Sequence, residues 1–186
     1  MKINSSLDHK IIPRLVKLGV ISIVFFCLLL TAISLLLPSS ITISRAIDIN
    51  APVSLVYGNI NNLANWKKWY ANYDSSSTSS STDISGKGAS FRSGKTTIKI
   101  DSITPVQIKT LWKTGNGDAM PSQFNFIRQG ESSVFTLQWQ FIQKVKWYPW
   151  EKFASIVSDK TIGPFMEKSL ENLKQLAENS AVDGNQ

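Results

Sequence analysis

The chain has very few of the residues that carry most nucleophilic and metal chemistry in proteins. Its 186 residues include one cysteine, Cys27, and one histidine, His9. A single cysteine cannot form a disulfide within the monomer. Because both residues precede Pro38, the chain from Pro38 onward has neither a Ser-His or Cys-His nucleophile nor the usual zinc ligands. We therefore expect no metal and no cofactor.

Acid–base chemistry would have to use carboxylates or tyrosines instead. The acidic candidates are Asp48, Asp101, Glu131, Glu151 and Asp159. None belongs to a recognisable spaced pair, and carboxylates beside lysines on strands are usually solvated. We therefore assign no catalytic residue.

The net charge is only moderately basic once the N-terminal tail is set aside. The whole chain carries a formal charge of +7, and the sixteen basic and twelve acidic residues from Pro38 onward leave +4 for that part. These basic residues alternate singly with apolar ones, whereas nucleic-acid binding proteins usually cluster them on one element. We expect no nucleic-acid partner.

One long apolar run is present. No charged residue lies between Lys17 and Arg45, and residues 18–37 are almost all Leu, Ile, Val and Phe. A helix rising ~1.5 Å per residue covers the ~30 Å hydrocarbon layer with this length. A secretory signal has an apolar core of only ~7–15 residues and a small-x-small cleavage site, which the ending 35–38, Leu-Leu-Leu-Pro, does not provide. The run predicts a retained transmembrane helix and makes the lipid bilayer a partner.

The charges that flank this run predict its orientation. Residues 1–17 contain four basic residues and one acidic residue, Asp8, whereas Arg45 stands alone after the run. Basic flanks stay on the cytoplasmic side. We therefore expect a single-pass membrane protein whose residues 1–17 are a cytoplasmic basic tail and whose domain, residues 38–180, is extracytoplasmic. Residues 181–186 are expected to be a disordered tail.

Hydrophobic periodicity predicts one α+β domain. Residues 41–49 alternate as a strand, a helix follows Pro52, and a second short helix carries Leu63, Trp66 and Trp69. The Ser/Thr-rich segment 74–83 is expected to be a mobile loop. Five more strands, joined by short turns typical of an antiparallel meander, and a long amphipathic helix are predicted at residues 86–91, 96–103, 106–113, 123–128, 133–146 and 162–178.

Four segments also share their residue pattern with a known family. They are IDINAPVSLVY at 47–57, INNLANWKKW at 60–69, GKGASF at 86–91 and IGPFMEKSLENLK at 162–174. In this order they resemble polyketide cyclase/dehydrase-like proteins of the SRPBCC, or START-like, superfamily, over residues 41–178. The resemblance implies a helix-grip fold, in which a curved antiparallel sheet surrounds a long C-terminal helix, with a cavity for lipids or other apolar ligands. It implies no single activity, because similar members include cyclases, hydrolases, lipid carriers and ligand-controlled regulators.

Aromatic residues at alternating strand positions are expected to face inward. The candidates for lining a ligand cavity are Trp112, Phe124, Phe126, Trp139, Phe165 and Met166. A fully packed core would produce the same pattern. If a pocket exists, Thr110 or Gln138 could supply a polar contact, although the position of Gln138 beside Trp139 favours an outward side chain.

A second aromatic cluster lies between the last predicted strand and the final helix. Its members, candidates for a lid or a membrane interface, are Trp147, Tyr148, Trp150 and Phe153. The cluster could pack the start of the helix, cover a cavity mouth, or rest on lipid headgroups beside Lys144, Lys146 and Lys152. We expect packing or a lid.

Together these observations predict a membrane-anchored domain that binds an apolar small molecule or lipid without turning it over. Two alternatives remain. One is a cyclase- or hydrolase-type enzyme that acts on a hydrophobic substrate. The other is an interaction domain whose core is completely filled. The sequence does not predict an oligomeric state.

Overall fold

The computed structural model describes residues 5–79, 81–128, 130 and 134–183. The chain divides into two compact units. The first unit comprises Met1–Ser39 with Val145–Ser155, and the second comprises Ser40–Lys144 with Ile156–Gln186.

Helix α1, Ser5–Leu36, contains the predicted apolar run. Its segment Leu15–Leu36 is long and apolar enough to cross a membrane. The hydroxyl of Thr31 donates a hydrogen bond to the carbonyl oxygen of Cys27, 2.8 Å away, which satisfies this polar group within the helix. A signal sequence near the N-terminus can also pass this test of length and hydropathy. Membrane attachment therefore stays a prediction.

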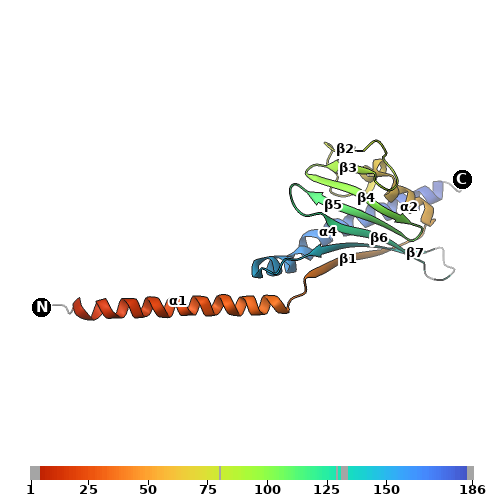
Figure 1. Ribbon diagram of the computed structural model, residues 1–186. Coiled ribbons are helices and arrows are strands. Elements are labelled where there is room, and N and C mark those ends of the chain that lie inside the picture. The colour runs from red at the N-terminus through yellow and green to blue at the C-terminus, as the bar shows by residue number, and fades with distance from the viewer. Residues whose placement is uncertain (1–4, 80, 129, 131–133, 184–186) are drawn as a thin grey trace. The chain divides into compact units, whose positions relative to one another are not determined.

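The second unit contains a seven-stranded antiparallel sheet in the order β1-β7-β6-β5-β4-β3-β2 (Figure 1). The strands are β1 Ser40–Ile49, β2 Thr78–Ser79, β3 Ser90–Ser93, β4 Thr96–Thr104, β5 Gln107–Thr114, β6 Met120–Arg128 and β7 Phe135–Lys144. The curved antiparallel sheet predicted from the sequence is thus confirmed, with one strand more than expected.

The additional strand corrects one expectation. Strand β2 lies inside the Ser/Thr-rich segment 74–83, which we expected to be a loop throughout, and it pairs with β3. Local hydrogen bonds, rather than hydrophobic burial, stabilise this segment. The backbone N–H of Ser76 donates to Asp74 Oδ1 at 2.9 Å, and the N–H of Ser90 donates to Ser81 Oγ at 2.9 Å.

The predicted helices of this domain are present. They are α2 Val53–Asn61, the 3₁₀ helix η1 Leu63–Asn65, α3 Trp66–Trp69 and α4 Pro149–Asp183. Helix α4 begins well before the predicted residue 162. The Gly163-Pro164 pair suggested a helix start, but Pro164 lies inside the helix, and the residue at the true start is Pro149. Residues 181–183 of the expected tail belong to α4, and residues 184–186 lie outside the described residues.

Aromatic side chains fill much of the space between the sheet and α4. The Trp66 ring centroid lies 4.6 Å from that of Trp69 and 5.6 Å from those of Phe91 and Trp112. Apolar residues of α4, among them Leu170, complete this core. We call these packed rings, with those of Phe124 and Trp139, the aromatic layer.

Each buried indole N–H in this layer has an acceptor. Trp66 Nε1 donates to the Ile60 carbonyl oxygen at 2.8 Å, and Trp139 Nε1 donates to Ser122 Oγ at 2.8 Å. Trp112 Nε1 donates to Thr110 Oγ1 at the same distance. The buried hydroxyls of Thr110 and Ser122 therefore act as hydrogen-bond acceptors for tryptophan N–H groups.

Amide side chains form a ladder across the opposite face of the sheet. Gln107 Nε2 donates to Asn125 Oδ1 at 2.7 Å, and Asn125 Nδ2 donates to Gln138 Oε1 at 3.2 Å. Gln138 Nε2 then donates to Ser44 Oγ. Gln138 thus lies on the outer face, as the alternation of β7 favoured, and the ladder links β5, β6, β7 and β1 through their side chains.

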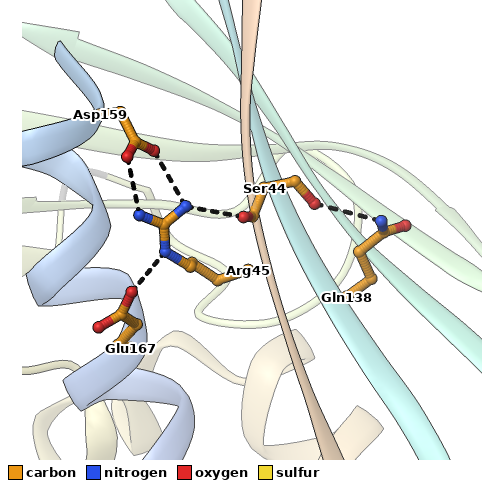
Figure 2. Close-up of polar contacts among 5 residues, drawn as sticks. All are labelled: Ser44, Arg45, Gln138, Asp159 and Glu167. Atoms are coloured by element: carbon orange, nitrogen blue, oxygen red, sulfur yellow. Dashed lines mark hydrogen bonds and ion pairs between the residues drawn. The ribbon is translucent and has the colours of Figure 1, made fainter.

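An ion-pair cluster joins the edge strand β1 to α4. Figure 2 shows Arg45 projecting from β1 between Asp159 and Glu167 of α4. Arg45 Nη1 lies 2.9 Å from Asp159 Oδ1, and Arg45 Nε lies 2.5 Å from Glu167 Oε1. The Arg45 side chain is 25% exposed, so it holds β1 against the helix while remaining partly hydrated.

Glycine at position 163 makes room for this arginine. A Cβ atom at Gly163 would lie 2.2 Å from Arg45 Nη2 and 2.9 Å from its Cζ, too close for van der Waals contact. Gly58 in α2 is a useful contrast because a Cβ there would meet no atom within 4 Å.

We predict that Gly163→Ala and Gly58→Ala will differ in their effects on stability. An alanine in a helix interior should stabilise by about 0.5–1 kcal/mol over glycine, and Gly58→Ala should show this gain. Gly163→Ala should show less, because its Cβ displaces Arg45 from the carboxylates. In an Arg45→Ala background the two gains should become equal. Urea unfolding followed by tryptophan fluorescence measures all of these variants, and an equal gain in the wild-type background would contradict the close approach.

We also predict an acid-sensitive contribution from the ion pair. The hydrogen bond from Arg45 lowers the pKa of Asp159 below its usual value. Because the folded-state pKa is lower than the unfolded one, this stabilisation is present above about pH 4 and is lost as the pH falls through the lowered pKa. Asp159→Asn and Arg45→Gln should each flatten the decline in unfolding midpoint below pH 4, and the double variant should do no more than either alone. A wild-type slope in both single variants would refute this contribution.

Candidate functional site

A cavity of about 680 Å³ lies in the second unit, bordered by part of the aromatic layer. This volume is within the ~300–1,000 Å³ typical of small-molecule sites. Its larger apolar lining residues are Tyr70, Trp112, Met120, Phe141, Ile142, Ile162 and Phe165. Its polar and charged side chains are Asn72, Thr96, Thr114, Asp118, Gln143 and Lys144.

Four aromatic rings make the apolar wall of the cavity. Trp112 on β5 and Phe141 on β7 point inward, with ring centroids 5.1 Å apart. Phe165 of α4 lies 6.0 Å from Phe141, and Tyr70, which follows α3, lies 5.5 Å from Trp112. Sheet and helix therefore both contribute to one apolar surface.

Tyr70 brings a hydroxyl to this wall. The residue is only 8% exposed. Burial raises the pKa of the Tyr70 phenol to about 12, because the charged phenolate would lose its hydration. At neutral pH Tyr70 is therefore protonated and can donate a hydrogen bond as well as accept one.

Gln143 brings an amide. It follows Phe141 by two residues on β7, at the next inward position of the strand. Its Oε1 atom is buried, and no hydrogen-bond partner for it is found among the described residues. The cavity thus combines a wall of aromatic rings with polar lining residues, among them Gln143.

The structure separates the predicted cavity residues into two groups. Trp112 and Phe165 line the cavity, whereas the other four are packed in the core: Phe124, Phe126, Trp139 and Met166. Ligand contact by any of them stays a prediction. Of the two suggested polar contacts, Thr110 accepts the hydrogen bond from Trp112, and Gln138 lies on the outer face and is therefore excluded.

Sequence reasoning missed several cavity residues. Tyr70 and Gln143 were not singled out, and neither was Asp118, the carboxylate that lines the cavity. Alternation along β7 was a usable signal for Gln143, because Phe141 faces inward two residues earlier. Of the acidic candidates, Glu131 lies outside the described residues, and Asp48, Asp101, Glu151 and Asp159 are not lining residues.

The second aromatic cluster lies in the first unit, and its two tryptophans are strongly exposed. Trp147 is 59% and Trp150 is 69% exposed, and the rings of Tyr148 and Trp150 stack with centroids 5.0 Å apart. The role of the cluster in helix packing, as a lid or at the membrane stays a prediction. The side chain of Phe153 lies outside the described residues.

Hydrogen bonds fasten this cluster to the end of α1. Lys152, 3% exposed, donates from Nζ to the carbonyl oxygens of Leu37 at 2.9 Å and Pro38 at 2.6 Å. Ser34 Oγ donates to the carbonyl oxygen of Trp147 at 2.7 Å. The ammonium group thus binds the two backbone carbonyls that directly follow α1.

Titratable side chains do not gather into a metal centre in the described part of the chain. No group of three or more His, Cys, Asp or Glu residues there could hold a metal ion.

Comparison with known proteins identifies the fold. No protein-family model matches the chain, and no curated protein matches it. Among solved structures, norcoclaurine synthase from Thalictrum flavum, in complex with dopamine and hydroxybenzaldehyde, is similar with a TM-score of 0.58 and 11% identity, over 74% of this chain and 86% of that one. CalU16 from Micromonospora echinospora is similar with a TM-score of 0.52 and 14% identity, over 73% and 65% of the two chains.

A START superfamily protein from Mycobacterium smegmatis is also similar, with a TM-score of 0.50 and 12% identity over 76% of this chain and 97% of that one. These likenesses agree with the resemblance that the sequence motifs suggested. The chain has an α+β helix-grip fold like that of this START superfamily protein. At such low identity the likeness establishes the fold and not the activity.

Proposed function

We propose that this protein is a membrane-anchored START-like domain that binds an apolar small molecule or lipid in the cavity between its sheet and α4. The observation that carries the proposal is the 680 Å³ cavity walled by Tyr70, Trp112, Phe141 and Phe165. A cavity of this size favours ligand binding over an interaction domain with a completely filled core.

Apolar contact would supply most of the binding free energy. Removing apolar surface from water contributes roughly 25 cal/mol per Å², so a ligand that covers these rings gains several kcal/mol before any polar contact forms. The charged side chains on the wall, Asp118 and Lys144, are both exposed and can remain hydrated when the cavity is occupied. The wall therefore favours a ligand with an extended apolar part.

Helix α1 would anchor the domain, with residues 1–17 in the cytoplasm and the domain outside. Support comes from the apolar segment Leu15–Leu36 and the basic residues that precede it. Trp147 and Trp150 are exposed beside the C-terminal end of this segment, to which Lys152 and Ser34 fasten them. Tryptophans prefer the headgroup region, so we place these two rings at the membrane–water interface.

We predict that filling the cavity will abolish ligand binding. In Ile162→Trp, a larger side chain on α4 enters the space beside Phe165 and should exclude the ligand. The full-length protein can be extracted from membranes in polymer-bounded lipid discs, and the small molecules bound to it identified by mass spectrometry. One stoichiometric compound should be present in the wild type and absent from Ile162→Trp.

Ile127→Trp is the matched control. Ile127 is 44% exposed on β6 and does not line the cavity, so its replacement adds the same ring elsewhere. Disc lipids should be recovered from all three proteins, and the cavity ligand only from the wild type and the control. Recovery of the same compounds in the same amounts from Ile162→Trp would refute the cavity as the binding site.

We also predict contact between the exposed tryptophans and lipid. Vesicles that contain lipids brominated near the headgroup should quench part of the tryptophan fluorescence of the reconstituted protein. The Trp147→Phe/Trp150→Phe double variant should lose most of this quenching, because the other four tryptophans are at most 5% exposed: Trp66, Trp69, Trp112 and Trp139. Undiminished quenching in the double variant, or none in the wild type, would contradict the interfacial position.

A further inference from the structure

Four consecutive strands of the sheet reach the cavity at the same end. Strands β4 and β6 contribute their first residues, Thr96 and Met120, and strands β5 and β7 contribute their last residues, Thr114 and Lys144. Neighbouring strands are antiparallel, so the start of one strand lies beside the end of the next. The cavity therefore lies at one end of the sheet.

The exposed residues of the lining mark the mouth of this cavity. Trp112 and Phe141 are at most 5% exposed and form an inner wall. Thr114, Ala119 and Lys144 also line the cavity, but they are exposed. Ala119 belongs to the turn that joins β5 to β6, and the other two residues end their strands. We call these three residues the rim, because they surround the opening of the cavity to solvent.

The chain connects the rim to the end of α1. Ser40, the first residue of β1, pairs with Lys144 in the β1–β7 ladder. Helix α1 ends at Leu36, so only residues 37–39 separate it from Ser40. Consecutive Cα atoms are about 3.8 Å apart, which limits the distance between the Cα atoms of Leu36 and Ser40 to about 15 Å in any orientation of the two units. Lys144 is therefore held close to the end of the apolar segment.

The residues that follow Lys144 lead back to the same helix end. They belong to the first unit and include the exposed Trp147. Ser34 Oγ of α1 donates a hydrogen bond to the carbonyl oxygen of Trp147, 2.7 Å away. Two chain connections thus join the rim to the end of α1, one through the strand partner of Lys144 and one along the chain itself.

We propose that the cavity opens toward the bilayer in which α1 is anchored, and that its ligand is a lipid of that same membrane, which enters through the rim without passing through bulk water. This inference rests on the proposed function, because it names the class and the source of the ligand that the same cavity takes. It chooses a membrane lipid over an apolar compound dissolved in water.

The chemistry of the wall gives this route its advantage. Every methylene group that leaves the membrane for water costs free energy in proportion to its exposed area, so the cost of releasing an acyl chain rises with its length. A rim at the membrane surface lets the chain pass from hydrocarbon to the rings of Trp112, Phe141 and Phe165 with little of it exposed. The headgroup stays at the opening, where Asp118 and Lys144 are exposed and can remain hydrated.

The first test measures which end of the sheet faces the bilayer, and it needs no ligand. In a Cys27→Ser background, a fluorophore is attached to the single thiol of Ala119→Cys or of its matched control, Val106→Cys. Val106 is 63% exposed and directly precedes β5, at the end opposite to Thr114. At ~3.3 Å per residue, these two ends of β5 are about 26 Å apart.

The full-length labelled proteins are placed in nanodiscs whose lipids carry a spin label on the headgroup, which quenches nearby fluorophores. The fluorophore at position 119 should lose most of its emission, and the one at position 106 should keep most of its own. Equal quenching at the two positions, or stronger quenching at position 106, would overturn the inference.

The second test follows the lipid itself. A phosphatidylcholine with a diazirine in mid-chain is built into the same nanodisc as the full-length protein, and a diazirine derivative of hexanol is added from water in a parallel sample. After irradiation, mass spectrometry maps the labelled peptides. Labelling of peptides that contain Trp112, Phe141 or Phe165 reports the cavity, and it is separated from labelling of α1 within the bilayer. The phosphatidylcholine probe should label the cavity peptides.

A bulky side chain at the rim should block this labelling. Ala119→Trp places a ring at the opening and should remove most of the labelling of cavity peptides by the phosphatidylcholine probe, while labelling of α1 is unchanged. Val106→Trp is the matched control, because it adds the same ring at the opposite end of β5, and it should label as the wild type does. Undiminished cavity labelling in Ala119→Trp would assign entry to another opening and overturn the role of the rim.

The two probes distinguish this inference from the function beneath it. Cavity labelling by the hexanol probe but not by the phosphatidylcholine probe would overturn the membrane lipid as ligand and would leave the proposed binding of an apolar molecule standing. Labelling of the cavity peptides by neither probe would overturn the proposed function and this inference with it.

Discussion

Packing of aromatic rings between the sheet and α4 is the constraint on which the rest of this structure depends. Large rings such as Trp66 and Trp139 fill the concave side of the sheet at little conformational cost, but each indole N–H must find an acceptor once it is buried. This requirement explains why Thr110 and Ser122 occupy inward positions among apolar residues. The volume beside the layer that the rings leave unfilled is the cavity.

The sequence predicted this layer because its signal is local. In β7 every second residue from Phe135 to Phe141 is apolar and buried, and the polar residues between them, such as Gln138, face outward. The same alternation continued by two residues reaches Gln143. Because glutamine is not hydrophobic, the pattern alone could not distinguish an inward-facing amide from the end of the strand. Tyr70 follows α3 outside any regular period, and only tertiary packing places it beside Trp112.

Contacts between residues far apart in the chain account for the remaining differences. Arg45 lies in an alternating strand, and no local pattern indicates its ion pairs because its partners Asp159 and Glu167 are more than one hundred positions away. Strand β2 likewise depends on a partner distant in the chain. A run of serines has no strand pattern of its own, and it forms a strand by pairing with the edge of β3. The early start of α4 was hidden because Gly163 and Pro164, usual marks of a helix boundary, lie within the helix. Gly163 is explained by Arg45, whose guanidinium occupies the space of a side chain.

Paired and unpaired polar atoms both occur in the interior of the second unit. Where rings pack completely, the hydroxyls of Thr110 and Ser122 each accept an indole N–H, so burial and hydrogen bonding agree. At Gln143 the two requirements diverge, because its Oε1 atom is buried and has no donor within the described chain. A leucine at that position would pack against Phe141 without this penalty. The unfilled volume beside the aromatic layer is therefore the observation that favours a ligand, whereas the Gln143 oxygen is buried away from it.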